Sequence, residues 1–247
     1  MANRTRTSEK SAASLAYDFL HDSIIGMKLK PGQPLNLEEL SEHLKVSRSP
    51  LRDAVIRLEH EGLITSLPHK GTLVSKINLK QANEECFLRI TIEEEIYSLF
   101  SDLCNERDIS RLRDYIKTQE KVIQDHDIRI FLKQDDEFHK YLYLRTDKEF
   151  SFNLLQNSIG HYNRLRLLTC TENRVVSSSI QEHKDMVGLF LKKDKDALKK
   201  AVRDHVMKVD NDKLELRSKY PELFEGDLKA NEPAENIFTK DFLSQLK

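Results

Sequence analysis

The chain has 247 residues, of which 38% are hydrophobic and 33% are charged, with 40 Lys and Arg against 41 Asp and Glu. Seven Gly, six Pro and no Trp favour a mainly helical protein of one large or two small domains, and argue against an all-β, collagenous or disordered chain. A net charge of −1 argues against a generally basic nucleic-acid binder, so only a local arrangement of basic residues can form a DNA-binding surface.

The cysteines and the apolar runs indicate the compartment. Cys86, Cys104 and Cys170 are far apart, so neither a disulfide framework nor a CxxC zinc or redox motif is predicted. No apolar run approaches the about 18 residues that a membrane span needs, and the first residues are polar. We therefore expect a cytoplasmic protein that is neither secreted nor embedded in a membrane.

The first 76 residues predict a winged helix-turn-helix. Residues 1–11 are polar and are expected to be flexible, after which apolar residues recur at helical spacing until Pro31-Gly32 ends the helix. Asn36, with Glu39 three residues later, predicts the N-cap of a short second helix. A third helix is expected from residues 47–50 to Gly62, followed by two short strands over residues 63–67 and 72–75 around a tight turn. The DNA-binding domain is thus placed at residues 12–76.

The remainder predicts an all-helical domain of six or seven helices at residues 77–225, so the fold class is mainly α. Gly and Pro are almost absent until Pro221. Six helices are expected near residues 79–104, 107–126, 128–145, 148–171, 174–192 and 194–217. Residues 226–247 are polar and are expected to form a C-terminal tail.

Basic and hydroxyl side chains gather at the start of the third helix. Arg48 and Arg52 are four residues apart and share a face opposite Leu51 and Val55. The N-terminal end of a recognition helix enters the major groove, where Arg bonds to guanine and Ser reaches phosphates or base edges. The alternative is a solvated helix face, which the adjoining wing and short helix disfavour. The predicted DNA contacts are Ser47, Arg48, Ser49, Arg52, His69, Lys70 and Gly71.

This stretch resembles the GntR family of bacterial transcription regulators. The resemblance rests on VSRSPLRDA at residues 46–54, EGLI at 61–64 and GTLV at 71–74, and it covers residues 12–76 almost without gaps. It implies DNA contacts by the residues that match Ser47, Arg48, Ser49, Arg52 and Gly71. Glu38 departs from the family pattern, because some members place there an Arg that touches phosphate.

Four polar residues lie on otherwise apolar helix stripes in the second domain. Asp135 and His139 are one turn apart on one stripe, while His183 and His205 lie on two others. Each could be a hydrogen-bonded core residue, since burial without a partner costs about 1 to 3 kcal/mol per group. Convergence on one divalent metal satisfies all four together, and the donor set suits zinc, nickel or manganese.

Residues 79–225 also resemble the FCD ligand-binding domain. The resemblance implies that Asp135, His139, His183 and His205 bind a metal, often zinc or nickel, beneath a pocket for a small carboxylate. The motifs that carry it are Arg89-x3-Glu93, Asp135-x2-Phe138-His139, Glu182-His183, His205, and the run YPELF at residues 220–224.

Three further residues are predicted to bind the effector. Arg89 suits a carboxylate, although an ion pair with Glu93 one turn away is an equal alternative. Asn157 and His161 are one turn apart and are also candidates, with core hydrogen bonding as the alternative. Arg164 and Arg166 are expected to be solvated or to lie at an interface.

These observations predict a transcription regulator and not an enzyme. We expect the regulator to be a repressor. We expect a homodimer that binds a palindromic double-stranded operator and senses a small organic acid through the bound metal. One alternative is a regulator whose metal is purely structural. Another is a metal-dependent enzyme acting on small carboxylates, but no general base stands beside the predicted ligands.

Overall fold

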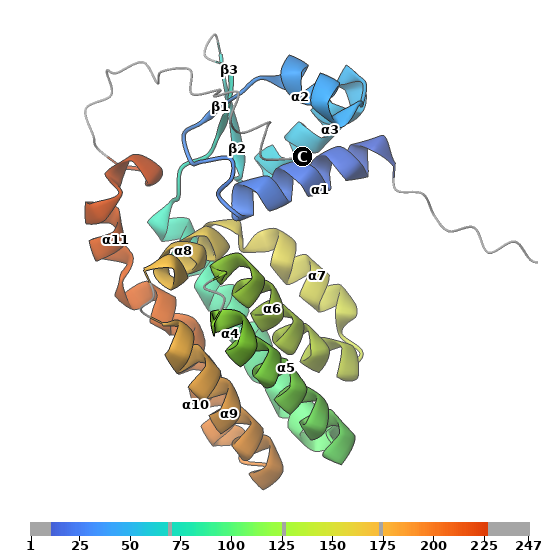
Figure 1. The fold of residues 1–247 in the computed structure, drawn as a ribbon, viewed down its shortest axis with the longest axis vertical. Coiled ribbons are helices and arrows are strands. Elements are labelled where there is room, and N and C mark those ends of the chain that lie inside the picture. The colour runs from blue at the N-terminus through green and yellow to red at the C-terminus, as the bar shows by residue number, and fades with distance from the viewer. Residues whose placement is uncertain (1–10, 69–70, 125–126, 173–174, 227–247) are drawn as a thin grey trace, which may run out of the picture. The chain divides into compact units, whose positions relative to one another are not determined.

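The structure is a computed structural model that describes residues 11–68, 71–124, 127–172 and 175–226 (Figure 1). The described chain divides into two compact units, one made of residues 11–76 with Gly226 and the other spanning Ile77–Glu225. The fold is mainly helical, and its small sheet belongs to the first unit. None of the helices in these ranges combines the length and the apolar character that crossing a bilayer requires.

The first unit contains the three predicted helices, α1 (Ala12–Ile25), α2 (Leu37–Leu44) and α3 (Arg48–His60). Asn36 begins α2 as predicted, because its side-chain oxygen accepts hydrogen bonds from the backbone N–H groups of Glu38 and Glu39. α1 ends earlier than predicted, since Gly26 and Met27 turn the chain before Pro31-Gly32 is reached. The apolar faces of the three helices and the adjoining strands form one buried core, which includes Leu20, Ile24, Leu40, Leu51, Val55, Leu58 and Val74.

The sheet of this unit has three antiparallel strands in the order β1-β3-β2, one more than predicted. β2 (Ile64–Leu67) and β3 (Gly71–Val74) form the predicted hairpin, with Leu67 opposite Gly71. β1 (Pro34–Leu35) pairs with β3. A strand of two residues has no alternating pattern of apolar and polar side chains, so the sequence did not predict it. Gly71 has a φ of +83°, a conformation that favours glycine at this end of the wing.

The second unit is a bundle around α4 (Leu79–Leu103), which contacts α6, α8, α9 and α10. Three further helices follow the predicted spans closely, namely α5 (Glu106–Gln124), α6 (Ile128–Arg145) and α9 (Val176–Lys192). Figure 1 shows α4, α5, α6, α9 and α10 running alongside one another. Side chains from several of these helices can therefore meet in the interior of the bundle.

Two predicted helices are each divided in two. The span 148–171 becomes α7 (Glu149–Ser158) and α8 (Gly160–Thr171), because Ile159 has non-helical backbone angles of φ −116° and ψ 40°. The span 194–217 becomes α10 (Lys195–Asn211) and α11 (Lys213–Lys219), and the break falls at Asn211-Asp212, where both residues have low helix propensity. The first break matters for the site, since it places α8 as a separate, buried helix.

The segment after α11 returns to the start of α4. A 3₁₀ turn at Pro221–Leu223 leads to Phe224, which pairs in parallel with Ile77. The Ile77 N–H donates to the Leu223 carbonyl at 2.9 Å, and Asn78 Nδ2 donates to Glu225 Oε2 at 2.6 Å. The predicted tail after Gly226 lies outside the described residues.

Candidate metal centre and DNA-binding surface

The four predicted metal ligands meet in the second unit. Asp135 and His139 come from α6, His183 from α9 and His205 from α10, and all four are buried. One donor atom from each lies within 4.8 Å of the donor atoms of the other three. The i, i+4 spacing on α6 places Asp135 and His139 on one inward face, and helix packing supplies the other two.

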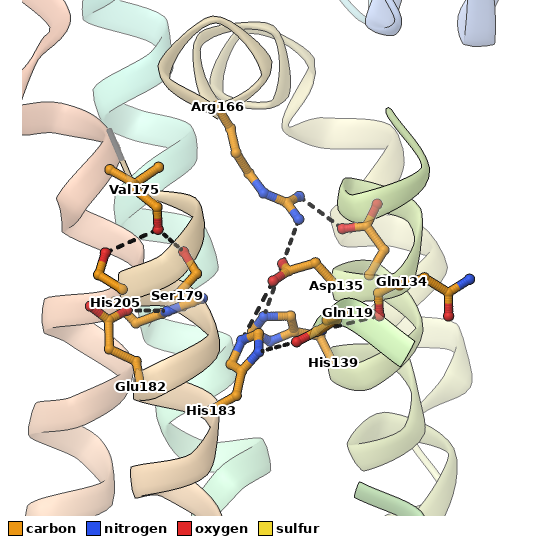
Figure 2. A network of polar contacts seen from close by, with 12 residues as sticks. Gln119, Gln134, Asp135, His139, Arg166, Val175, Ser179, Glu182, His183 and His205 are labelled. Carbon is orange, nitrogen blue, oxygen red and sulfur yellow. Dashed lines mark hydrogen bonds and ion pairs between the residues drawn. The ribbon is translucent and has the colours of Figure 1, made fainter. Parts of the chain in front are cut away.

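Each imidazole is held through its Nδ1 atom, and Figure 2 shows these contacts for His183 and His205. His183 Nδ1 lies 3.0 Å from Gln119 Oε1, and His205 Nδ1 lies 2.7 Å from Glu182 Oε2. Because both partners are oxygen acceptors, these two rings carry the proton on Nδ1 and have a lone pair on Nε2. His139 Nδ1 lies 2.9 Å from the Tyr97 hydroxyl. Outer contacts of this kind orient histidines toward a bound metal.

The Nε2 atoms of His139 and His183 are buried and have no hydrogen-bond partner among the described residues. Each lies 3.5 Å from a carboxylate oxygen of Asp135. Buried polar atoms without partners are rare, and these two point at the same carboxylate. A divalent cation between the four side chains would satisfy both atoms, so the residues fit a metal.

The electrostatics favour the same protonation states that a metal requires. Burial lowers the pKa of His183 and His205 well below the usual value for imidazole, which keeps both rings neutral. Burial by itself would raise the pKa of Asp135, but the Arg166 guanidinium brings it well below its usual value. Three nitrogen donors and one ionised carboxylate suit zinc, nickel or manganese.

A small cavity of about 20 Å³ lies beside this centre, with room for about one water molecule. Asp135 and His205 belong to its wall, which joins it to the candidate metal site. The polar side chains from the neighbouring helices that line it are Tyr162, Arg166, Cys170, Ser179 and Lys208.

The expectation that Arg164 and Arg166 are solvated or interfacial is wrong for the described chain, because both are buried on α8. Arg166 donates to Asp135 Oδ2 at 2.5 Å and to Asp136 Oδ1 at 2.8 Å. Figure 2 shows its guanidinium on one side of Asp135 and the imidazoles on the other. Because α8 is buried on all sides, its sequence has no polar face, and periodicity could not reveal this residue.

Arg89 forms the ion pair with Glu93 that was the alternative to effector binding. Its Nε donates to Glu93 Oε1 at 2.9 Å, and both side chains are buried. Arg89 NH1 also donates to the Tyr162 hydroxyl at 3.3 Å, so it stands behind a residue of the cavity wall rather than in the wall itself. The predicted contact with an effector would therefore require Arg89 to exchange partners.

The structure places the other two predicted effector residues away from this cavity. His161 is buried at the start of α8, where its Nδ1 accepts from the Asn78 backbone N–H at 3.0 Å. Asn157 is half-buried on α7 and does not line the cavity. Beside His161, the Glu85 carboxylate accepts the Tyr162 N–H at 2.7 Å, and burial raises the pKa of Glu85 to about 7.

The predicted DNA-binding residues that the structure describes are exposed. Ser47 precedes α3 and makes no capping hydrogen bond, and Ser49 and Arg52 lie in the exposed first turns. Arg48 is exposed and donates to Glu38 Oε1 at 2.7 Å, so the residue that departs from the family pattern contacts the recognition helix. A Cβ on Gly71 would meet no described atom within 4 Å, so the backbone at this position is open. His69 and Lys70 lie outside the described residues.

A winged helix-turn-helix with exposed arginines at the start of α3, joined to a helical unit with a buried candidate metal centre, defines a DNA-binding transcription regulator. The model of bacterial regulatory proteins of the gntR family matches residues 12–74, and that of the FCD domain matches residues 86–208. The chain belongs to the GntR family of bacterial transcription regulators, with an FCD domain as its C-terminal part.

The relatives of this chain are named as transcription regulators, not as enzymes. The chain is 26% identical over 208 residues to the HTH-type transcriptional repressor RspR of Escherichia coli K12, covering 84% of this chain and 91% of the relative. It is 23% identical to a probable D-xylose utilization operon transcriptional repressor of Paenarthrobacter nicotinovorans, with 83% and 90% covered. The E. coli McbR/YncC structure has the same fold, with a TM-score of 0.71, 16% identity, and 86% of this chain and 100% of that chain covered.

Proposed function

We propose that this regulator is a metal-dependent repressor whose DNA binding is weakened by a small organic acid. It acts as a homodimer on a palindromic operator, and Asp135, His139, His183 and His205 hold one divalent metal per protomer. The observation that carries the proposal is the convergence of their donor atoms within 4.8 Å beside a cavity, in a chain whose other unit is built to bind DNA.

The DNA-binding part of the proposal assigns different roles to exposed residues. Arg52 reads a base in the major groove, since it lies on the exposed face of α3 within its first turns. Ser47 and Ser49 reach phosphates or base edges, and the open backbone at Gly71 allows close approach to the sugar-phosphate chain. One such module contacts few base pairs, which favours two copies on a two-fold operator.

The sensing part rests on the coordination that four protein ligands leave open. Nickel and manganese accept up to six donors and zinc can expand from four donors to five, so an anionic oxygen can join the four side chains. The cavity borders Asp135 and His205, which gives such an oxygen a route to the metal. A tenfold change in DNA affinity requires about 1.4 kcal/mol of coupling between the two sites, which lies within the usual range.

The test begins by selecting operator sequences from a random DNA pool with the full-length, metal-loaded protein. Fluorescence anisotropy then measures operator affinity with and without a panel of mono-, di- and tricarboxylates. We expect one acid to weaken binding at least tenfold in the wild type and in Asp114→Ala, a control on the exposed face of α5. The response should vanish in Asp135→Ala/His139→Ala.

The same experiment separates the sensing role from a purely structural metal. An acid that acts equally on the metal-free double variant would show that the effector does not use the metal. If metal raises the thermal stability but none of the acids changes operator affinity, the metal would be structural and the regulator would respond to another signal.

A further inference from the structure

Arg166 retains hydrogen-bond donors toward the cavity. Its guanidinium has five N–H groups, of which one bonds to Asp135 and one to Asp136 among the described residues. The side chain is buried and belongs to the cavity wall. It therefore stands next to a metal ligand with free N–H groups and a full positive charge, the arrangement that receives a carboxylate in two-point contact.

A second cation, Lys208, enters the same wall from α10. Its ammonium donates to Glu182 at 2.6 Å, to Ser179 at 3.0 Å and to Ser178 at 3.2 Å. Two of its three donors thus bond to neutral hydroxyls. A carboxylate is a stronger acceptor for an ammonium group than a hydroxyl, so an acid in the cavity can displace these serine contacts.

The charge of the wall favours more than one anionic group. Among the described residues that line it, Asp135, Arg166 and Lys208 carry formal charges, and a divalent metal on Asp135 would leave these lining groups with an excess of positive charge that a single carboxylate does not neutralise. Asp136 pairs with Arg166 and Glu182 pairs with Lys208, so these two carboxylates offset part of this excess. Their side chains are 35% and 32% exposed, so solvent screens their contribution.

We infer that the effector is a short dicarboxylate, with one carboxylate between the metal centre and Arg166 and the other on Lys208. The inference rests on the proposed function and narrows the chemical class of its effector. Arg166 lies on α8 and Lys208 lies on α10. Each cation can therefore bind its own carboxylate group of the diacid. The cavity of about 20 Å³ has room for about one water molecule, so a diacid requires the side chains of the wall to move apart, and a short diacid requires the smallest movement.

Titration calorimetry on the full-length, metal-loaded protein tests this assignment. The probes are malonate, succinate, malate and glutarate, each compared with its monoamide, which keeps the shape of the acid and removes one charge. We expect at least one diacid to bind tenfold or more tightly than its monoamide. Metal content is measured after each titration, because diacids can also chelate metal from the protein.

Variants then assign the second carboxylate to Lys208. Lys208→Met should reduce the preference for that diacid over its monoamide to about twofold or less, whereas Lys208→Arg should keep it. Lys200→Met is the matched control, since Lys200 is an exposed lysine of the same helix that pairs with Asp204. Arg166→Met should weaken the diacid and its monoamide together.

The outcomes separate this inference from the proposed function. If monoamides bind as tightly as their diacids, or if Lys208→Met keeps the full preference, the dicarboxylate assignment is wrong while sensing of a carboxylate stands. If neither class binds to the metal-loaded protein, the proposed effector and this inference both fail.

Discussion

Replacement of Arg166 by Met should strongly destabilise the metal-free protein and affect the metal-loaded protein much less. Arg166 and Asp135 are 7% and 3% exposed, and the guanidinium donates to the carboxylate at 2.5 Å. Removing one partner of a buried ion pair costs about 3 to 5 kcal/mol, because the remaining charge stays buried without compensation. His183 also contacts Asp135, but its neutral ring does not replace the lost positive charge.

A bound metal changes this balance. It would supply two positive charges next to Asp135, so the carboxylate would keep a positive partner in the loaded variant, and the uncompensated loss would be the contact between Arg166 and Asp136. The Asp136 side chain is 35% exposed, and such pairs contribute about 1 kcal/mol or less. We therefore expect the cost of Arg166→Met to fall by about 2 kcal/mol or more when metal is added.

Urea unfolding in chelator and in excess metal measures the difference. Tyrosine signals report mainly on the second unit, since six of the seven tyrosines follow residue 77 and the chain lacks Trp. The wild type shows how much metal changes the free energy of unfolding when the site is intact. Lys200→Met is the control for a substitution on the surface. An equal loss of stability with and without metal would show that the metal does not compensate Asp135, and would contradict our account of the centre.

Four further measurements test other parts of the molecule. His183→Ala should lose the metal in elemental analysis while His60→Ala, at an exposed position, retains it; full retention in His183→Ala would remove it from the ligand set. Arg52→Ala should weaken operator binding by about 1 to 3 kcal/mol and scrambled DNA much less, and equal losses on both duplexes would refute base reading. Burial raises the pKa of Glu85 in the folded protein to about 7, above its ordinary value of 4.5. The stability that protonated Glu85 contributes is therefore complete below pH 4.5 and is lost as the pH rises to about 7. Glu85→Gln should remove this decline in the free energy of unfolding. Analytical ultracentrifugation at micromolar concentration should show a dimer, and a monomer with and without operator would exclude the proposed assembly.

Local patterns in the sequence were sufficient to predict most elements. The apolar spacing from Ala16 to Ile24, the cap at Asn36 and the two short strands of the hairpin depend on a few neighbouring residues, so spacing alone predicts these elements. The same holds for the inward direction of Asp135 and His139, which follows from helical geometry. Breaks in long helices were less predictable, because Ile159 leaves the helix without Gly or Pro at its own position.

The tertiary structure decided how the inward-facing residues meet. Each histidine was expected to be buried, but its orientation depends on partners distant in sequence, such as Gln119 for His183 and Tyr97 for His139. Arg166 entered the site only because α8 is buried on every side and lies against α6, a contact that no periodicity encodes. The sequence alone thus determined which side chains face inward on each helix, since that is a property of one helix at a time. Their distances and charge partners, and the cavity beside them, arise from packing between helices and could be known only from the fold.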